Sequence, residues 1–294
     1  MAPKRRPVTI AEEHPGGGAS RWVARGLILT LVALVGLAAW FGGRSLLQGA
    51  LGPRCQATAG GSSVDVDPEQ MSNAATITAL ALRRGLPAHA ATIGLATAIQ
   101  ESKLRNIRYG DRDSVGLFQQ RPSQGWGTVE QLLDPEYSTD KFYDALVKVD
   151  GWESGTITVV AQEVQRSAYP EAYADHEQEG RIMASALAGH SPLGVGCRLD
   201  DPEGEADVAL IGLLLDTEYG LEPTAGDGTL TVTASSDRIA ASVASWSVAK
   251  AVDTNITGVT VGDRRWTRSR DSTAWSWQTT DEPAPARQVV LHLT

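Results

Sequence analysis

The chain has 294 residues, of which 42% are hydrophobic and 21% are charged, and its formal net charge is −9. This length predicts one domain of ordinary size and a second, smaller one. The composition excludes a largely disordered protein. Residues 1–25 carry a net charge of +3, so the rest of the chain carries −12. An acidic main body argues against nucleic acid as a partner.

The N-terminal region predicts a membrane anchor. We expect residues 1–25 to form a basic, cytoplasmic, disordered tail. Residues 26–43 contain no charged side chain. That uncharged run is close to the roughly 17–25 residues that a membrane helix needs. A retained anchor and a cleaved signal peptide both fit, but the absence of a small-x-small cleavage site favours the anchor. We therefore expect a single-pass protein with an extracytoplasmic body, joined to its span by a flexible Gly/Ser-rich linker, residues 44–69.

The periodicity of the body predicts a mainly helical α+β domain over residues 70–198 and a small α+β domain over residues 205–294. The run 206–220 fits either a helix or a buried strand. We expect a turn-rich loop at 106–127 and a hairpin turn at 261–264. The expected helices cover 71–85, 87–104, 128–133, 135–149, 157–165, 170–188 and 237–252, and the expected strands cover 229–234, 257–261, 274–277 and 288–293.

The most informative stretch, residues 90–126, contains a single acid at the end of an apolar helix. Between Pro87 and Leu104 only Glu101 and Lys103 are charged. Burial and the negative end of the helix dipole both disfavour a carboxylate, so the pKa of Glu101 should be raised. A carboxylic acid that stays protonated near neutral pH is suited to general acid catalysis on a glycosidic oxygen.

Glu101-Ser102, followed by the residues GLFQ at 116–119, resembles the Glu-Ser … Gly-Leu-Met-Gln signature of soluble lytic transglycosylases and related lysozyme-like domains. The longer run YGDRDSVGLFQQRPSQGWGT, with VQRSAYPEAYADHE downstream, is similar to lysozyme-like domains of actinobacterial wall-associated proteins. The resemblance covers roughly residues 70 to 190. It implies a lysozyme-like fold, with Glu101 as general acid and then base on peptidoglycan glycan strands.

Several further residues are candidates for this site. The amides of two glutamines suit sugar hydroxyl and N-acetyl groups, and aromatic rings can stack on sugars or pack in the core. The downstream segment departs from the family's Ala-Tyr-Asn motif, with Gln165 and Tyr169 in its approximate place. A second carboxylate would come from Asp111 or Asp113, although a transglycosylase needs only one acid. The proposed substrate-binding residues are Ser102, Tyr109, Gln119, Gln120, Trp126, Gln165 and Tyr169.

The two cysteines, Cys55 and Cys197, bracket this domain. Outside the cell they can form a disulfide, which would stabilise the fold by about 4–5 kcal/mol in the chain-entropy model. The alternative is two unrelated thiols. Two cysteines and five scattered histidines predict no metal site, and we expect no cofactor.

The C-terminal part contains no catalytic constellation. Its tryptophans fit either a carbohydrate-binding surface or the core of a small sheet, and the core is favoured because Trp275 and Trp277 would share one strand face. A protein partner of this part is a further hypothesis. For the whole chain, the sequence predicts a membrane-anchored enzyme that cuts the MurNAc–GlcNAc bond, either a lytic transglycosylase or a muramidase. The alternative is a non-catalytic peptidoglycan-binding or envelope scaffold protein with the same fold.

Overall fold

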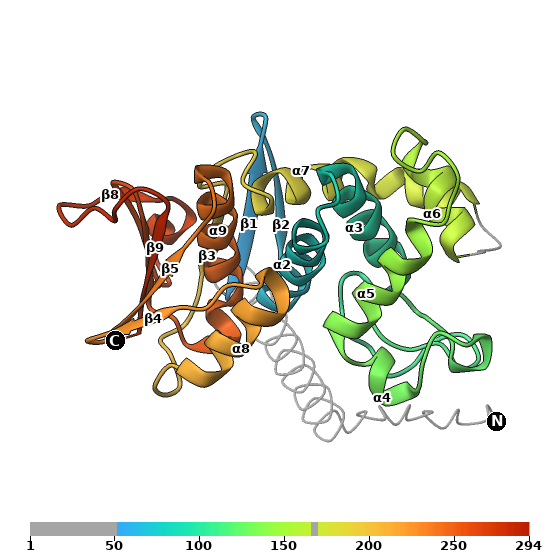
Figure 1. Ribbon diagram of the computed structural model, residues 1–294, viewed down its shortest axis with the longest axis horizontal. Helices are drawn as coiled ribbons and strands as arrows, with labels where there is room; N and C mark the ends of the chain where they lie inside the picture. Colours follow the sequence, from blue (N-terminus) through green and yellow to red (C-terminus); the bar gives the residue numbers. More distant parts are fainter. Residues whose placement is uncertain (1–51, 166–169, 294) are drawn as a thin grey trace, which may run out of the picture. The chain divides into compact units, whose positions relative to one another are not determined.

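A computed structural model describes residues 52–165 and 170–293 of the protein (Figure 1). From Pro53 onward the chain belongs to one compact unit. The described residues form eight α-helices and two antiparallel sheets, which confirms the mixed α and β composition. The helices are α2 (Pro68–Arg83), α3 (Ala88–Ser102), α4 (Val129–Leu132), α5 (Pro135–Leu146), α6 (Ile157–Gln165), α7 (Glu177–Leu187), α8 (Val208–Tyr219) and α9 (Asp237–Thr254).

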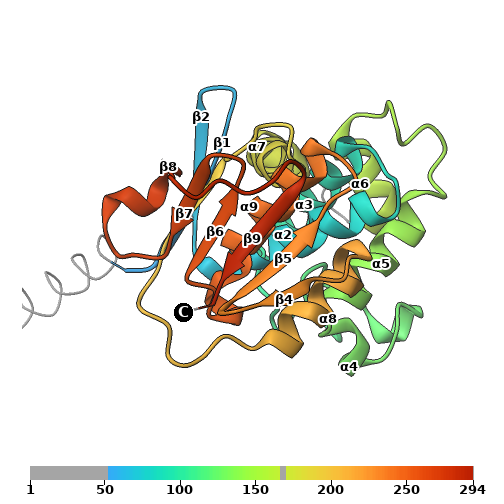
Figure 2. The same ribbon diagram turned by 60° about the vertical axis from the view of Figure 1, so that its left-hand side comes forward.

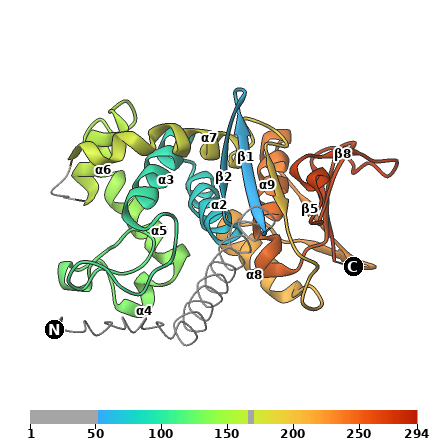
Figure 3. The same ribbon diagram turned by 180° about the vertical axis from the view of Figure 1, so that it is seen from behind.

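One sheet has three strands in the order β2-β1-β3, and the other has six in the order β4-β5-β9-β6-β7-β8. Helix α9 packs against β6 and β9 of the larger sheet, as Figure 2 shows. In the front and back views, helices α3 to α6 lie away from the larger sheet, and α2 lies between these helices and the sheet (Figure 3). The strands are β1 (Arg54–Ala59), β2 (Ser62–Val66), β3 (Val195–Arg198), β4 (Thr224–Gly226), β5 (Thr229–Thr233), β6 (Gly258–Val261), β7 (Arg264–Thr267), β8 (Gln278–Thr279) and β9 (Gln288–His292).

Local signals place most helices where the sequence predicted them. Thr128 and Gln131 form a capping box at the start of α4, and the Asp134 side chain accepts the backbone N–H groups of Glu136 and Tyr137 at the start of α5. The ambiguous run 206–220 is the helix α8, which the Asp207 side chain caps by accepting from the Leu210 N–H. The segment 170–188 divides into a 3-10 helix, η2 (Pro170–His176), followed by α7.

Two expectations are wrong. Much of the segment expected to be a flexible linker is the hairpin of β1 and β2, which turns at Gly60 and Gly61, both with positive φ. Alternate residues of β1, Cys55 and Ala57, are buried, so packing overrides the flexible composition. The predicted strand 274–277 overlaps a 3-10 helix, η3 (Ser272–Trp275). Another short 3-10 helix, η1 (Pro122–Gln124), lies within the predicted loop 106–127.

The predicted disulfide is confirmed. Cys55 and Cys197 face each other on the antiparallel strands β1 and β3, and their sulfurs are bonded. The bond joins positions 142 residues apart. In the chain-entropy model a loop of this length stabilises the fold by about 5 kcal/mol. The disulfide therefore ties the first described strand to the end of the helical part.

Three of the four tryptophans of the C-terminal part belong to the core, as favoured, and Trp275 is half-buried. Trp246 and Trp266 are fully buried, and Trp277 is nearly so. The indole N–H of Trp266 donates to the Ala274 carbonyl, and that of Trp277 donates to the Val195 carbonyl. These rings are therefore not available to stack on a sugar. Trp275 lies in η3 rather than on the predicted strand, where the Arg198 guanidinium lies over its ring.

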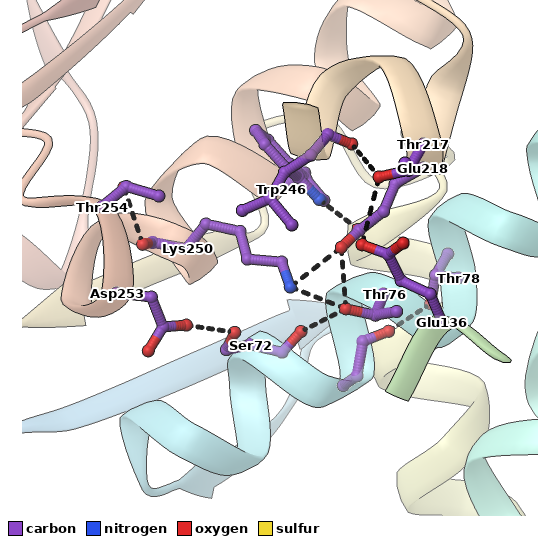
Figure 4. Close-up of polar contacts among 12 residues, drawn as sticks. Ser72, Thr76, Thr78, Glu136, Thr217, Glu218, Trp246, Lys250, Asp253 and Thr254 are labelled. Atoms are coloured by element: carbon purple, nitrogen blue, oxygen red, sulfur yellow. Dashed lines mark hydrogen bonds and ion pairs between the residues drawn. The ribbon is translucent and has the colours of Figure 1, made fainter. Parts of the chain in front are cut away.

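A buried ion pair between α8 and α9 is hydrogen-bonded to α2 (Figure 4). The Lys250 ammonium of α9 lies 3.0 Å from a carboxylate oxygen of Glu218, a fully buried residue of α8. The same ammonium donates to the Thr76 hydroxyl of α2 at 2.6 Å, and that hydroxyl donates to Glu218 at 3.0 Å. The other carboxylate oxygen accepts the Trp246 indole N–H at 2.5 Å. Every charge in this cluster is thus matched by a partner from another helix.

No helix within the described ranges is long and apolar enough to cross a membrane. The predicted span, residues 26–43, lies outside those ranges.

Replacing Lys250 by Met should destabilise the chain by about 3–5 kcal/mol, because it leaves the Glu218 carboxylate buried without its cation. The double variant Lys250→Met/Glu218→Gln should recover most of this loss, because the glutamine carbonyl can still accept the Trp246 N–H. Urea unfolding of the purified chain measures both. As a control, Lys141→Met removes an exposed pair and should cost less than about 1 kcal/mol. Equal losses in the single and double variants would contradict this account.

Candidate active site

Helix α3 places Glu101 in its last turn. The helix is Ala-rich and buried over most of its length, from Ala90 to Ile99. It ends abruptly because Lys103 and Leu104 both take left-handed conformations, and the Leu104 N–H donates to the Ala98 carbonyl six residues back. Since Leu104 is also buried, this end is fixed by packing and by backbone bonds. The acid is therefore held at a rigid helix terminus.

One side chain from this helix end and one from α6 hold the GLFQQ turn, residues 116–120. The Ser102 hydroxyl, which is buried, donates to the Leu117 carbonyl at 2.7 Å. The Gln165 amide of α6 donates to the Phe118 carbonyl at 2.7 Å. Gly116 makes the turn possible: its φ is +80°, and a Cβ there would lie 2.2 Å from the Leu132 carbonyl oxygen. The turn thus lies directly against the acid-bearing helix.

The Glu101 carboxyl is only partly accessible and is contacted by neutral donors. The Tyr173 hydroxyl of η2 donates to Glu101 Oε1 at 2.7 Å. Burial raises the pKa of Glu101 above its usual value, and hydrogen bonds from Tyr173 and Gln165 oppose part of that rise. No charged side chain of the described residues contributes to this shift. The raised pKa that the sequence predicted therefore comes mainly from desolvation.

A cavity of about 840 Å³ lies beside this arrangement and shares Gln165 with it. It brings together two residues that the sequence singled out, Gln165 and Trp126, of which Trp126 is half-buried. Amides, one aromatic ring and both signs of charge are available in its walls, a combination that suits a polar, uncharged ring system more than an apolar ligand. The lining residues are Gln124, Trp126, Ala145, Lys148, Val149, Gln162, Glu163, Val164 and Gln165.

The two glutamines of the turn serve the loop itself. Gln120 is buried, and its amide donates to the Ser138 carbonyl at 3.1 Å. Gln119, with a φ of 47°, directs its amide to the carbonyls of Tyr109 and Gly116. The Tyr109 side chain is 75% exposed and does not line the cavity. These contacts give Gln120 a structural role in place of a substrate contact.

The two candidate second carboxylates, Asp111 and Asp113, have partners of their own. Asp111 is exposed, and its nearest cation is Arg112 at 3.8 Å. Asp113 accepts hydrogen bonds from the Ser123 N–H and hydroxyl and from the Arg121 guanidinium. These bonds, led by the Ser123 N–H, hold the pKa of Asp113 well below its usual range. Asp113 therefore fastens the loop around η1 instead of assisting the acid.

The structure adds Tyr173 to the candidate functional residues, because the sequence did not assign it to the site. It lies 72 residues from Glu101, so no local pattern joins the two. The available signal was its position in the segment that replaces the family's downstream motif, four residues after Tyr169. Tyr169 itself lies outside the described residues. Within the described ranges, no group of His, Cys, Asp or Glu side chains could hold a metal ion.

No protein-family model matches the chain, and none of the curated proteins matches it.

Replacing Tyr173 by Phe should raise the pKa of Glu101 further, because it removes a donor to the charged form. A raised pKa means that the folded state keeps a proton which the unfolded chain has released. Stability therefore falls as pH rises from the ordinary glutamate range through the pKa of folded Glu101. Tyr173→Phe should deepen this fall, by about 1.5–3 kcal/mol at neutral pH, and Glu101→Gln should abolish it.

Urea unfolding between pH 4 and pH 8 measures this dependence, with ¹³C NMR of the Glu101 carboxyl as a direct titration. Tyr109→Phe is the matched control, since that hydroxyl does not contact the acid. A Tyr173→Phe protein with an unchanged Glu101 titration would exclude the hydrogen bond as a cause of the pKa.

Proposed function

We propose that the chain is a peptidoglycan-cleaving enzyme in which Glu101 acts as general acid and then base on the MurNAc–GlcNAc bond. The observation that carries this proposal is the Glu101 carboxyl itself, whose pKa burial raises and whose only described polar contacts are neutral donors. Such a group can hold a proton near neutral pH and release it to a glycosidic oxygen. The substrate class comes from the resemblance of Glu101-Ser102 and the GLFQ residues to the signature of lysozyme-like domains.

The arrangement favours a single-acid reaction. Glu101 gives its proton to the bridging oxygen as the bond from the muramyl C1 to that oxygen breaks. The C6 hydroxyl of the same muramyl residue then bonds to C1 and returns its proton to the Glu101 carboxylate. This sequence balances without water and yields a 1,6-anhydro end. A hydrolase of the two-carboxylate type would need a second acid nearby, and Asp113 is engaged by Arg121 and Ser123.

Tyr173 and Gln165 have positioning roles in this proposal. Both donate toward Glu101, so they fix the carboxyl orientation and stabilise the anion that proton transfer leaves behind. Gln165 also lines the neighbouring cavity with Trp126, which makes that cavity the candidate place for the glycan. We further propose that residues 70–198 form the lysozyme-like domain, and that residues 26–43 anchor it with the body outside the membrane, where its polymer lies.

Replacing Glu101 by Gln should lower the release of soluble fragments from purified wall sacculi by about 10²–10⁴-fold, the usual contribution of general acid–base catalysis. Chromatography with mass spectrometry of the products measures the rate and also identifies 1,6-anhydro ends. The control is Glu153→Gln, which alters an exposed glutamate elsewhere in the chain.

Equal release by the Glu101→Gln protein and the unaltered chain would overturn the assignment of the acid. Sedimentation with sacculi without any release would instead favour the non-catalytic wall-binding alternative. Reducing ends in place of anhydro ends would favour hydrolysis.

A further inference from the structure

A second cavity lies in the C-terminal part, away from Glu101. We call it the C-terminal groove: a space of about 490 Å³ between the loop after α7, the first turns of α9, the β6–β7 turn and the loop before β9. Its volume is within the roughly 300–1,000 Å³ range of ligand sites. None of the residues assigned to the proposed reaction lines it. The groove is therefore a separate feature of the molecule.

Small and apolar side chains line the inner part of the groove. Ala240 and Ala241 of α9 are buried there, and Leu193 and Val261 are partly buried on the walls. Leu193 has a φ of 60°, as has Arg287 across the groove. Non-glycine residues in this conformation are uncommon and are strained, and such residues cluster at functional sites. The lining contains no aromatic side chain, so the floor offers small apolar contacts, which suit methyl groups, and no protein ring on which a ligand could stack.

The rim of the groove is basic in a chain whose net charge is −9. Three guanidiniums from three different elements surround it, those of Arg238, Arg264 and Arg287, against the carboxylates of Asp237 and Asp263. Arg264 and Asp263 are 3.5 Å apart, and Arg287 and Asp237 are 3.7 Å apart, and all four side chains are substantially exposed. Exposed pairs at such distances are weak, so a ligand carboxylate can compete for these guanidiniums.

We propose that the C-terminal groove binds the stem peptide of peptidoglycan, an anionic peptide rich in alanine. This inference rests on the proposed function, since it gives the same polymer a second point of contact. Stem peptides combine methyl side chains with free carboxylates, and the groove combines an alanine-lined floor with an arginine rim. Arginine binds carboxylates through paired N–H donors, which provides orientation as well as affinity.

The chemistry of the rim and floor disfavours other small ligands. A nucleotide would require a surface for its base to stack on and a stronger excess of positive charge than three arginines against two aspartates. A fatty acyl chain would require a longer apolar channel than these few small side chains supply. The size and charge of the groove therefore suit a short peptide with at least one carboxylate better than a nucleotide or a fatty acyl chain.

The test is calorimetric titration of the purified full chain with the synthetic peptide N-acetyl-L-alanyl-γ-D-glutamyl-L-lysyl-D-alanyl-D-alanine. The same peptide with both carboxyl groups amidated is the second titrant. The variant is Arg264→Gln/Arg287→Gln, whose exposed side chains can be changed with little effect on folding, to be checked by circular dichroism. Arg270→Gln is the matched control, because Arg270 is also exposed and paired with an aspartate but does not line the groove.

We expect the free peptide to bind the unaltered chain and the Arg270→Gln protein equally. Binding should weaken at least tenfold in the double arginine variant and with the amidated peptide. Absence of binding to the unaltered chain, or equal binding by the double variant, would overturn the proposal. Self-association of the chain that the double variant abolishes would also overturn it and would assign the groove to a second copy.

The Glu101→Gln protein separates this proposal from the proposed function. It should bind the peptide normally while releasing soluble fragments about 10²–10⁴-fold more slowly. Lost cleavage with intact peptide binding supports both assignments. If that protein still cleaves normally and binds the peptide, the assignment of Glu101 as the acid is wrong, and the assignment of the groove as a peptide site stands.

Discussion

The buried carboxylate of Glu218 is the strongest constraint in the structure. An ionised carboxyl removed from water is tolerated only when cations and donors replace its hydration. Here Lys250, Thr76 and Trp246 supply them, and these residues come from α9 and α2. Because α3 packs on α2, the helix that carries Glu101 rests on an element that α8 and α9 fix in place. The C-terminal part is thus integrated with the candidate site, although its sequence contains no catalytic pattern.

At the candidate site, contacts from the surrounding elements likewise fix a partly buried carboxyl, that of Glu101. The acid sits at a helix end where the backbone turns sharply at Lys103 and Leu104, so its position is set before any side chain contributes. Ser102 then fixes the GLFQQ turn through one carbonyl and Gln165 fixes it through the next. Partial burial raises the pKa of Glu101, and the uncharged donors Tyr173 and Gln165 moderate the rise. A carboxyl in such surroundings can exchange a proton more readily than one held in an ion pair, as Asp113 is.

The sequence predicted what depends on neighbours along the chain. The capping box at Thr128, the Asp134 cap and the raised pKa of Glu101 all follow from residues within a few positions of one another. Contacts between distant segments were not predictable in this way. Tyr173 reaches Glu101 across 72 residues. β1 was taken for a linker because its Gly/Ser-rich turn to β2 suggested flexibility, whereas its second partner, β3, lies more than a hundred residues away. Gln120 was predicted incorrectly for another reason, because residue type alone suggested a ligand contact. In the structure Gln120 pairs with Val115 in a β-bridge, and its buried amide donates to the Ser138 carbonyl.

Rigid attachment of the two parts has a consequence for binding a polymer. The proposed acid lies on α3 and the proposed peptide groove borders α9, and both helices pack on α2, to which the buried Glu218–Lys250 pair is hydrogen-bonded. Two contacts on one rigid body engage a cross-linked polymer as a single event only when their separation matches the spacing of the polymer's own groups. A flexible linker would relax that requirement, whereas the Glu218–Lys250 pair enforces it. The groove would then act on selectivity, because it would favour glycan strands whose stem peptides are present and correctly spaced over strands that lack them.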